Sequence, residues 1–208
     1  MAFDLEEQEQ LDEFKAWWDK NGKMVTGLIV AIVLAYAGWQ GYQYWMQTQA
    51  TEASNAYQAL VTTDTKNVAE VKAQADKLTK DYKSTPYAGR AAVFAAKAQY
   101  AASDIASAKT QLEWAIANAK ESSVQAIAGL QLAGILYESK DYTGATKVLN
   151  AIQDTGYAGL KHNMLGDVLL AQGKTAEAKT AYDTALKSLD PQGKFFQLTK
   201  QKYEALGA

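Results

Sequence analysis

The residue types best suited to catalysis or metal binding are scarce in this chain. It holds a single histidine, His162, and no cysteine among 208 residues. A zinc site needs three or four ligands, and a nucleophile–histidine–acid arrangement would have to use His162. No glycine-rich phosphate loop follows a strand pattern, and the acidic residues fall on polar faces of expected helices. The sequence therefore predicts no catalytic residue, no metal site and no cofactor, and it places His162 at a partly buried packing position in a helix.

The longest apolar stretch of the chain runs from Met24 to Trp45, and no charged residue occurs between Lys23 and Glu52. A helix of about 22 residues is about 33 Å long, close to the roughly 30 Å thickness of a bilayer's hydrocarbon core. Because hydrocarbon offers the backbone no hydrogen-bond partner, we expect one transmembrane helix over residues 24–45. The residues expected to hold its ends at the two interfaces are Trp17, Trp18, Lys20 and Lys23, and then Trp39, Tyr42, Tyr44 and Trp45.

Two other interpretations of this stretch compete with a membrane anchor. Ala35-Tyr36-Ala37 matches the small-x-small pattern of a signal-peptide cleavage site. The start of the chain is acidic, however, whereas signal peptides begin with a short basic region, and the apolar stretch continues past that site. A buried core helix would be unusually long for a segment so free of charge. An uncleaved anchor is the favoured interpretation.

The distribution of basic residues predicts the orientation of this anchor. Lys15, Lys20 and Lys23 precede it, and the next lysine or arginine is Lys66. Because basic residues stay preferentially in the cytoplasm, residues 1–23 are expected there and residues 46–208 on the opposite side. Residues 4–20 are expected to form an acidic amphipathic helix that ends at Asn21-Gly22. Its aromatic face either rests at the membrane interface or contacts a cytoplasmic partner.

The residues after the anchor have the composition of one all-α domain. Alanine is abundant, only two prolines occur (Pro86 and Pro191), and the whole chain has 21 basic and 23 acidic residues. A nucleic-acid-binding protein would carry a basic patch, and none is visible, so no nucleic-acid partner is expected. Helices over residues 49–82 are expected to cover one end of this domain, and a helix over residues 192–206 the other.

Three segments between these ends can be superimposed, at about 88–122, 125–156 and 158–191, with equivalent positions 37 and then 33 residues apart. A period of this length is typical of antiparallel helix pairs stacked as a solenoid. Each segment has a break between its halves, at Ser103-Asp104, Lys140-Asp141 and Gly173-Lys174. Small residues are expected where the paired helices approach closely, namely Ala96, Ala133, Gly166, Ala108, Ala145 and Ala178.

The third segment, LGDVLLAQGKTAEAKTAYDTALKSLDP, resembles a tetratricopeptide repeat, with Gly166, Gly173, Ala178, Tyr182 and Ala185 on that motif's positions. The whole chain also resembles one family, the ancillary subunit of the bacterial Sec (SecYEG) translocon. The matching motifs are FKAWWDKNGK at 14–23, GWQGYQYW at 38–45 and the junction from Tyr82 through Pro86-Tyr87-Ala88-Gly89.

The resemblance implies a single-pass protein of the bacterial inner membrane with a periplasmic tetratricopeptide-like domain. It implies a non-catalytic interaction module that binds the Sec translocon and a membrane-anchored periplasmic chaperone of the prolyl-isomerase type, assisting newly exported proteins. It implies no small-molecule substrate. It also places a partner-binding groove on the first helix of each pair, at Arg90, Val93, Lys97, Tyr100, Ile127, Leu130, Gly134, Tyr137, Asn163, Asp167 and Leu170.

Two alternatives remain open at this point. One is a membrane scaffold or a regulator of envelope-stress signalling that acts through the cytoplasmic N-terminal helix. The other is an enzyme, for instance one acting on cell-wall polymer, which would depend on His162 because no other catalytic group is available.

Overall fold

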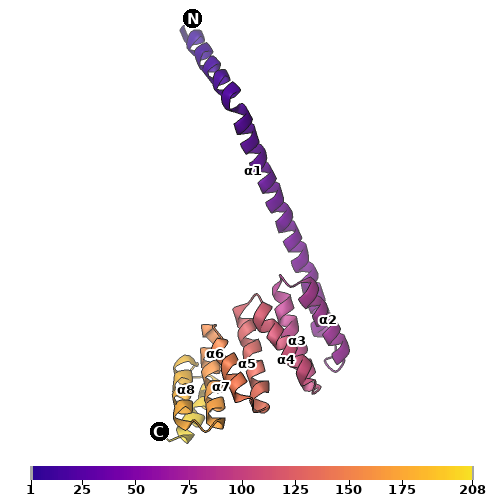
Figure 1. The fold of residues 1–208 in the computed structure, drawn as a ribbon, viewed down its shortest axis with the longest axis vertical. Helices are drawn as coiled ribbons and strands as arrows, with labels where there is room; N and C mark the ends of the chain where they lie inside the picture. Colours follow the sequence, from indigo (N-terminus) through magenta and orange to yellow (C-terminus); the bar gives the residue numbers. More distant parts are fainter. Residues whose placement is uncertain (1, 208) are drawn as a thin grey trace. The chain divides into compact units, whose positions relative to one another are not determined.

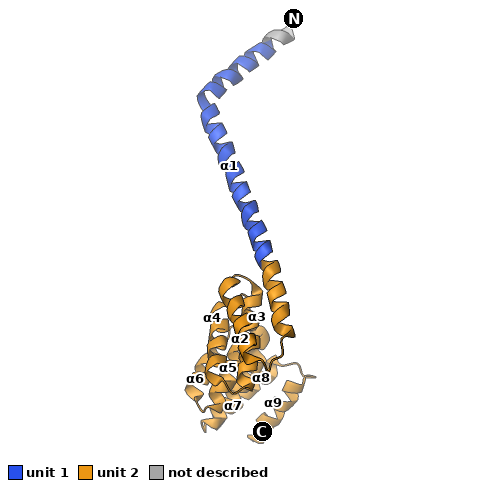
Figure 2. Ribbon diagram, turned by 90° about the vertical axis from the view of Figure 1, so that its right-hand side faces the viewer, with its two compact units in different colours: residues 1–49 blue, residues 50–208 orange. Residues whose placement is uncertain are grey.

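The structure, a computed structural model, describes residues 2–207 and contains no strand among them. Its helices are α1 (Ala2–Thr62), α2 (Val68–Asp81), α3 (Pro86–Ala101), α4 (Ile105–Asn118), α5 (Ser122–Glu138), α6 (Tyr142–Ala151), the 3₁₀ helix η1 (Thr155–Tyr157), α7 (Ala158–Ala171), α8 (Thr175–Ser188) and α9 (Lys194–Ala205). The prediction of an all-α fold is confirmed. The chain divides into two compact units, residues 1–49 and residues 50–208 (Figure 2).

The first unit consists of the N-terminal part of α1, and here one expectation is wrong. The helix does not end at Asn21-Gly22 but continues through both residues. The Asn21 amide donates to the Trp17 carbonyl, 3.0 Å away, and Gly22 lies against the Trp18 indole, 3.1 Å from where a Cβ would stand. A glycine that ends a helix usually adopts a positive φ. Gly22 does not, and α1 continues through it.

The second unit is a series of helix pairs, as the repeat period predicted. Helices α3 and α4, α5 and α6, and α7 and α8 pack against each other, with α2 on α3 and α9 on α8. Figure 1 shows α3 to α8 following one another along this unit. The end of α1 also belongs to it, since Ala53 and Leu60 are fully buried against α2 and α3. Within the stretch 49–82, helix α1 continues to Thr62 and α2 follows from Val68 to Asp81.

The three breaks expected within the repeats are turns with left-handed backbone. Ser103 and Lys140 have φ of 64°, and Gly173 has φ of 76°. The following aspartates cap the second helices of the first two pairs: Asp104 accepts from the Ser107 N–H at 3.1 Å, and Asp141 from the Gly144 N–H at 2.9 Å. An N-cap oxygen satisfies one of the free N–H groups at a helix start, so the sequence directs each turn locally.

Small residues occupy the positions where the paired helices come closest. The six small residues expected there are all buried: Ala96, Ala133, Gly166, Ala108, Ala145 and Ala178. Tyr182 fills the space opposite Gly166, where an added Cβ would stand 2.4 Å from the tyrosine ring. Leu112 and Leu149 are the corresponding large buried residues of the other two pairs. The core is thus a continuous series of contacts between neighbouring helices, which is why one pair alone could not bury its apolar face.

Candidate functional site

The expected groove residues lie on α3, α5 and α7, and the structure separates them by exposure. Arg90, Lys97, Tyr100 and Leu170 are exposed. Val93, Leu130 and Tyr137 are half-buried and pack against the main core cluster, so they contribute to stability as well as to any surface. The remaining expected residues are also half-buried: Ile127, Gly134, Asn163 and Asp167.

A cavity of about 300 Å³ lies between α3 and α5 and brings together three of the expected residues, Lys97, Tyr100 and Gly134. Two further residues that line it, Gln131 and Glu138, were not expected. The Tyr100 hydroxyl donates to the Glu138 carboxylate, and this hydrogen bond raises the pKa of Tyr100. A helical stripe could have revealed both residues, because Gln131, Gly134 and Glu138 follow one another at spacings of three and four.

Arg90 holds α3 to the start of α5 rather than standing free. Its guanidinium donates to both carboxylate oxygens of Glu121, from Nε at 2.7 Å and from Nη2 at 2.6 Å. This two-pronged contact lowers the pKa of the Glu121 carboxyl group. The guanidinium also lies 5.9 Å from the centre of the Tyr87 ring. Arg90 therefore orders the first two helix pairs relative to each other.

The expected residues of α7 are engaged by the C-terminal helix. The Asp167 carboxylate accepts from the Tyr182 hydroxyl at 2.7 Å and from Lys202 Nζ on α9 at 2.7 Å. Asn163 Oδ1 accepts from the hydroxyl of Thr199, which is fully buried, at 3.0 Å. At the third pair α9 therefore covers these polar groups, and the cavity between α3 and α5 is the open part of the expected groove.

The interface residues expected for the membrane anchor are exposed along α1. They are Trp17, Trp18, Lys20, Lys23, Trp39, Tyr42, Tyr44 and Trp45. Ring contacts join several of these aromatic residues, for example Tyr42 and Trp45, whose centroids are 6.1 Å apart. Among the described residues, α1 is the one helix long and apolar enough to cross a membrane, and none of its apolar window is buried.

The described residues contain no cluster of three or more histidine, cysteine, aspartate or glutamate side chains that could hold a metal ion. His162 is half-buried on α7, and its burial lowers the pKa of the imidazole, with a smaller contribution from Lys161. A packed, neutral imidazole agrees with the structural role expected for it.

Stacked helix pairs with a mixed polar and aromatic face define the class of helical-repeat binding proteins. Residues 15–208 match the family described as a tetratricopeptide repeat-like domain, so the chain belongs to that family. The chain is 32% identical over 209 residues to the ancillary SecYEG translocon subunit of Neisseria gonorrhoeae, covering 99% of this chain and 100% of that protein. It is 27% identical over 191 residues to the protein of that name in Haemophilus influenzae (90% and 92% covered) and 28% identical over 185 residues to the one in Escherichia coli (88% and 88%). The expected resemblance is confirmed, and the chain is a member of this family of translocon subunits.

Proposed function

We propose that this chain is a non-catalytic protein-interaction module, anchored by residues 24–45 in the bacterial inner membrane. In this proposal residues 1–23 lie in the cytoplasm and residues 46–208 in the periplasm. The module associates with the Sec translocon and works with a membrane-anchored chaperone of the prolyl-isomerase type on newly exported proteins. The observation that carries the proposal is the match over 99% of this chain to a relative named as a translocon subunit.

The arrangement of side chains supports binding rather than catalysis. The face formed by α3 and α5 offers a tyrosine, a lysine and a glutamate around a cavity of about 300 Å³. Tyrosine supplies contact area and a hydrogen bond at a low cost in side-chain entropy, which suits recognition of a protein partner. The exposed apolar length of α1 supports tethering, which raises the effective concentration of the module near other membrane proteins.

The direct test is affinity purification of the tagged full chain from membranes in mild detergent. We expect the translocon and a prolyl-isomerase-type chaperone to co-purify. A photoreactive residue at Tyr100 should crosslink to a partner, whereas one at Thr110, exposed on α4, serves as the matched control. Purification that recovers neither translocon nor chaperone would refute the proposal.

A second candidate function rests on the N-terminal part of α1. Phe14, Trp17 and Trp18 are exposed there and their rings stack, with Phe14 6.2 Å from each tryptophan. In a scaffolding or envelope-stress signalling role, this aromatic face would bind a cytoplasmic regulator. Deletion of residues 1–19 keeps Lys20 and Lys23 and separates the two functions. A deletion variant that loses the envelope-stress response of the cell but still binds the translocon as the parent does would favour signalling.

A further inference from the structure

The N-terminal part of α1 has one face that differs from the rest of its apolar surface. Five residues on it follow one another at spacings of four, three, four and three: Ile29, Val33, Tyr36, Gln40 and Gln43. Because an α-helix has 3.6 residues per turn, residues at these spacings lie on the same side of the helix. All five side chains are exposed. We refer to these five residues as the glutamine face.

Gln40 is a polar side chain inside the apolar stretch that ends at Trp45. It lies five residues before Trp45, which corresponds to about 7.5 Å along the helix. This depth in the bilayer rests on the proposed anchoring of residues 24–45, but not on association with the translocon. Hydrocarbon offers an amide no hydrogen-bond partner, so the polar atoms of Gln40 must be satisfied by protein.

The chain itself satisfies this amide only in part. Gln40 Nε2 donates to the Tyr36 hydroxyl, 2.8 Å away. Because the amide turns toward Tyr36, on the preceding turn, it does not extend toward the nearer interface at Trp45. A glutamine side chain has a second N–H and a carbonyl oxygen, and neither bonds to another described residue. One donor and one acceptor of Gln40 are therefore left for a partner.

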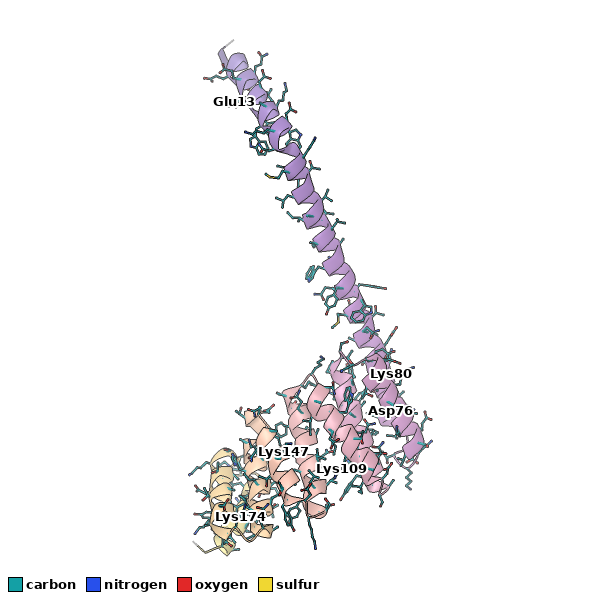
Figure 3. The ribbon with its side chains drawn as sticks, in the orientation of Figure 1. Glu13, Asp76, Lys80, Lys109, Lys147 and Lys174 are labelled. Atoms are coloured by element: carbon teal, nitrogen blue, oxygen red, sulfur yellow. The ribbon has the colours of Figure 1, made fainter. Side chains whose placement is uncertain are left out.

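Nothing in the described part of the first unit covers the glutamine face. Side chains extend outward on all sides of α1 there (Figure 3), and none of its apolar window is buried. In a bilayer, a partner for this face must have a backbone whose own hydrogen bonds are satisfied, and a transmembrane helix meets that condition. Glutamine side chains of membrane helices commonly hydrogen-bond across helix–helix interfaces. A second transmembrane helix therefore suits this face.

A second copy of the same helix supplies the required groups at the required depth. A glutamine amide is complementary to another glutamine amide, because each carries both donors and an acceptor. Every copy has the same basic residues before the apolar stretch, so every copy is inserted in the same orientation. Two parallel copies place Gln40 opposite Gln40 and Gln43 opposite Gln43. Such a contact is isologous, since both copies use the same face.

We propose that the chain forms a parallel dimer in the membrane, in which the glutamine faces of two copies pack together and the Gln40 side chains hydrogen-bond across the interface. Alternating spacings of four and three are typical of a left-handed helix pair, whose contacts repeat every seven residues. Ile29 and Val33 supply apolar contacts in the first half of the apolar stretch. Gln40 and Gln43 supply hydrogen bonds toward its other end.

Disulfide crosslinking tests this interface directly, because the chain has no cysteine of its own. The full chain is produced with one introduced cysteine, and isolated inner membranes are oxidised with copper phenanthroline. We expect Ile29→Cys and Gln43→Cys, on the glutamine face, each to give a disulfide-linked dimer. Ala31→Cys and Gly41→Cys are matched controls, since each lies two residues further along or back and on the opposite side of the helix. We expect at least about fivefold less dimer from them.

Substitutions in the Ile29→Cys chain supply an independent arm. Gln40→Leu removes the amide at similar size, and it should lower the dimer fraction about threefold or more. Gln40→Asn keeps an amide and should retain more dimer than Gln40→Leu. Gly38→Leu, on the opposite side of the helix, is the matched control and should leave the dimer fraction unchanged. Resistance of each chain to alkaline extraction from the membrane measures anchoring separately.

Four results would overturn the proposal. A chain that resists alkaline extraction but gives no dimer from Ile29→Cys or Gln43→Cys would refute the dimer and leave the proposed anchoring intact. Equal crosslinking from both sides of the helix would mean that copies only collide. Loss of dimer in Gly38→Leu but not in Gln40→Leu would move the interface to the opposite side. Release of the parent chain by alkali would refute the anchoring and the dimer together.

Discussion

Single side chains decide how closely the paired helices approach in this domain. Gly166 accepts the ring of Tyr182, which is fully buried and whose hydroxyl donates to Asp167 at 2.7 Å. Gly89 plays a similar part against Ala119, whose Cβ would lie 2.5 Å from an added Cβ. Protein interiors are close-packed, so a contact of this kind leaves no room for a larger residue.

A first prediction concerns Gly166. Replacing it with leucine should force α7 and α8 apart, because the first added carbon already overlaps the Tyr182 ring. Overpacking of this kind typically lowers the free energy of unfolding by about 1–3 kcal/mol or more. Thermal unfolding of the full chain in mild detergent measures the effect. Gly134→Ala is the matched control, since its Cβ would meet only the flexible end of Met164 at 3.4 Å, and an equal loss in both variants would contradict the packing account.

A second prediction concerns acid. Hydrogen bonds from Ser107 lower the pKa of Asp104, and the hydrogen bond from Arg90 lowers that of Glu121. Both carboxyl groups therefore bind a proton less readily in the folded than in the unfolded chain. Their stabilising contribution is complete above the ordinary pKa of about 4 and is lost as the pH falls through the lower folded values.

We therefore expect the melting temperature to fall as the pH is lowered from about 5 to about 3. Glu121→Gln and Asp104→Asn cannot titrate, and each should make that fall shallower than in the parent chain. Asp64→Asn is the matched control, because it makes the same kind of substitution in an exposed turn after α1. Identical pH profiles for parent and variants would count against the assignment.

At the scale of elements, the turns inside the helix pairs are what make each pair fold back on itself. All three place a residue at positive φ, but only the third uses glycine, at Gly173. A residue with a Cβ is destabilised in this conformation by about 1–2 kcal/mol, because its Cβ clashes with the backbone. The first two turns, at Ser103 and Lys140, retain that strain.

A third prediction follows at this scale. Ser103→Gly and Lys140→Gly should each raise the free energy of unfolding by about 0.5 kcal/mol, the relief of strain less the greater freedom of glycine in the unfolded chain. Gly173→Ala should lower it by about 1 kcal/mol. Melting temperatures of the three variants test this. A gain in stability from Gly173→Ala would show that the turn does not need its left-handed residue.

At the scale of the whole molecule, the chain combines an exposed apolar helix with a packed helical-repeat unit. The apolar window of α1 is entirely unburied, whereas the second unit has a continuous core. In water an exposed apolar surface of this length would be unfavourable, and in a bilayer it is the expected state. The exposed apolar surface of the first unit therefore suits a bilayer, whereas the packed second unit suits water.

A fourth prediction tests the orientation. The chain has no cysteine, so a single introduced cysteine reports on one site without interference. In intact spheroplasts, a membrane-impermeant maleimide should label Asn67→Cys, which lies after the apolar segment, and should not label Ala2→Cys. Both variants should be labelled once the membrane is dissolved in detergent. Labelling of Ala2→Cys in intact spheroplasts would place the N-terminus outside the cytoplasm and refute the proposed topology.

Patterns that repeat locally were readable from the sequence. The helix pairs, the three turns and the small residues at the helix crossings follow from periodicity and from turn and cap residues, whose effects reach only a few positions along the chain. The helix stop expected at Asn21-Gly22 also rested on local residue types, and it was wrong. In the structure the Asn21 amide donates to the Trp17 carbonyl within the helix and Gly22 lies against the Trp18 indole, and α1 continues through both residues.

The surface was readable only in part, because exposure depends on which helices meet. Asn163 and Asp167 stand on the expected face of α7, yet Thr199 and Lys202 from α9, more than 30 residues later, bind them. Gln131 and Glu138 join Tyr100 in one cavity only because α3 and α5 lie side by side. The sequence by itself determined the all-α class, the apolar segment and the repeat, since each depends on spacing along the chain. Only the tertiary structure decided which polar groups are covered and where a cavity remains open, because these depend on contacts between distant segments.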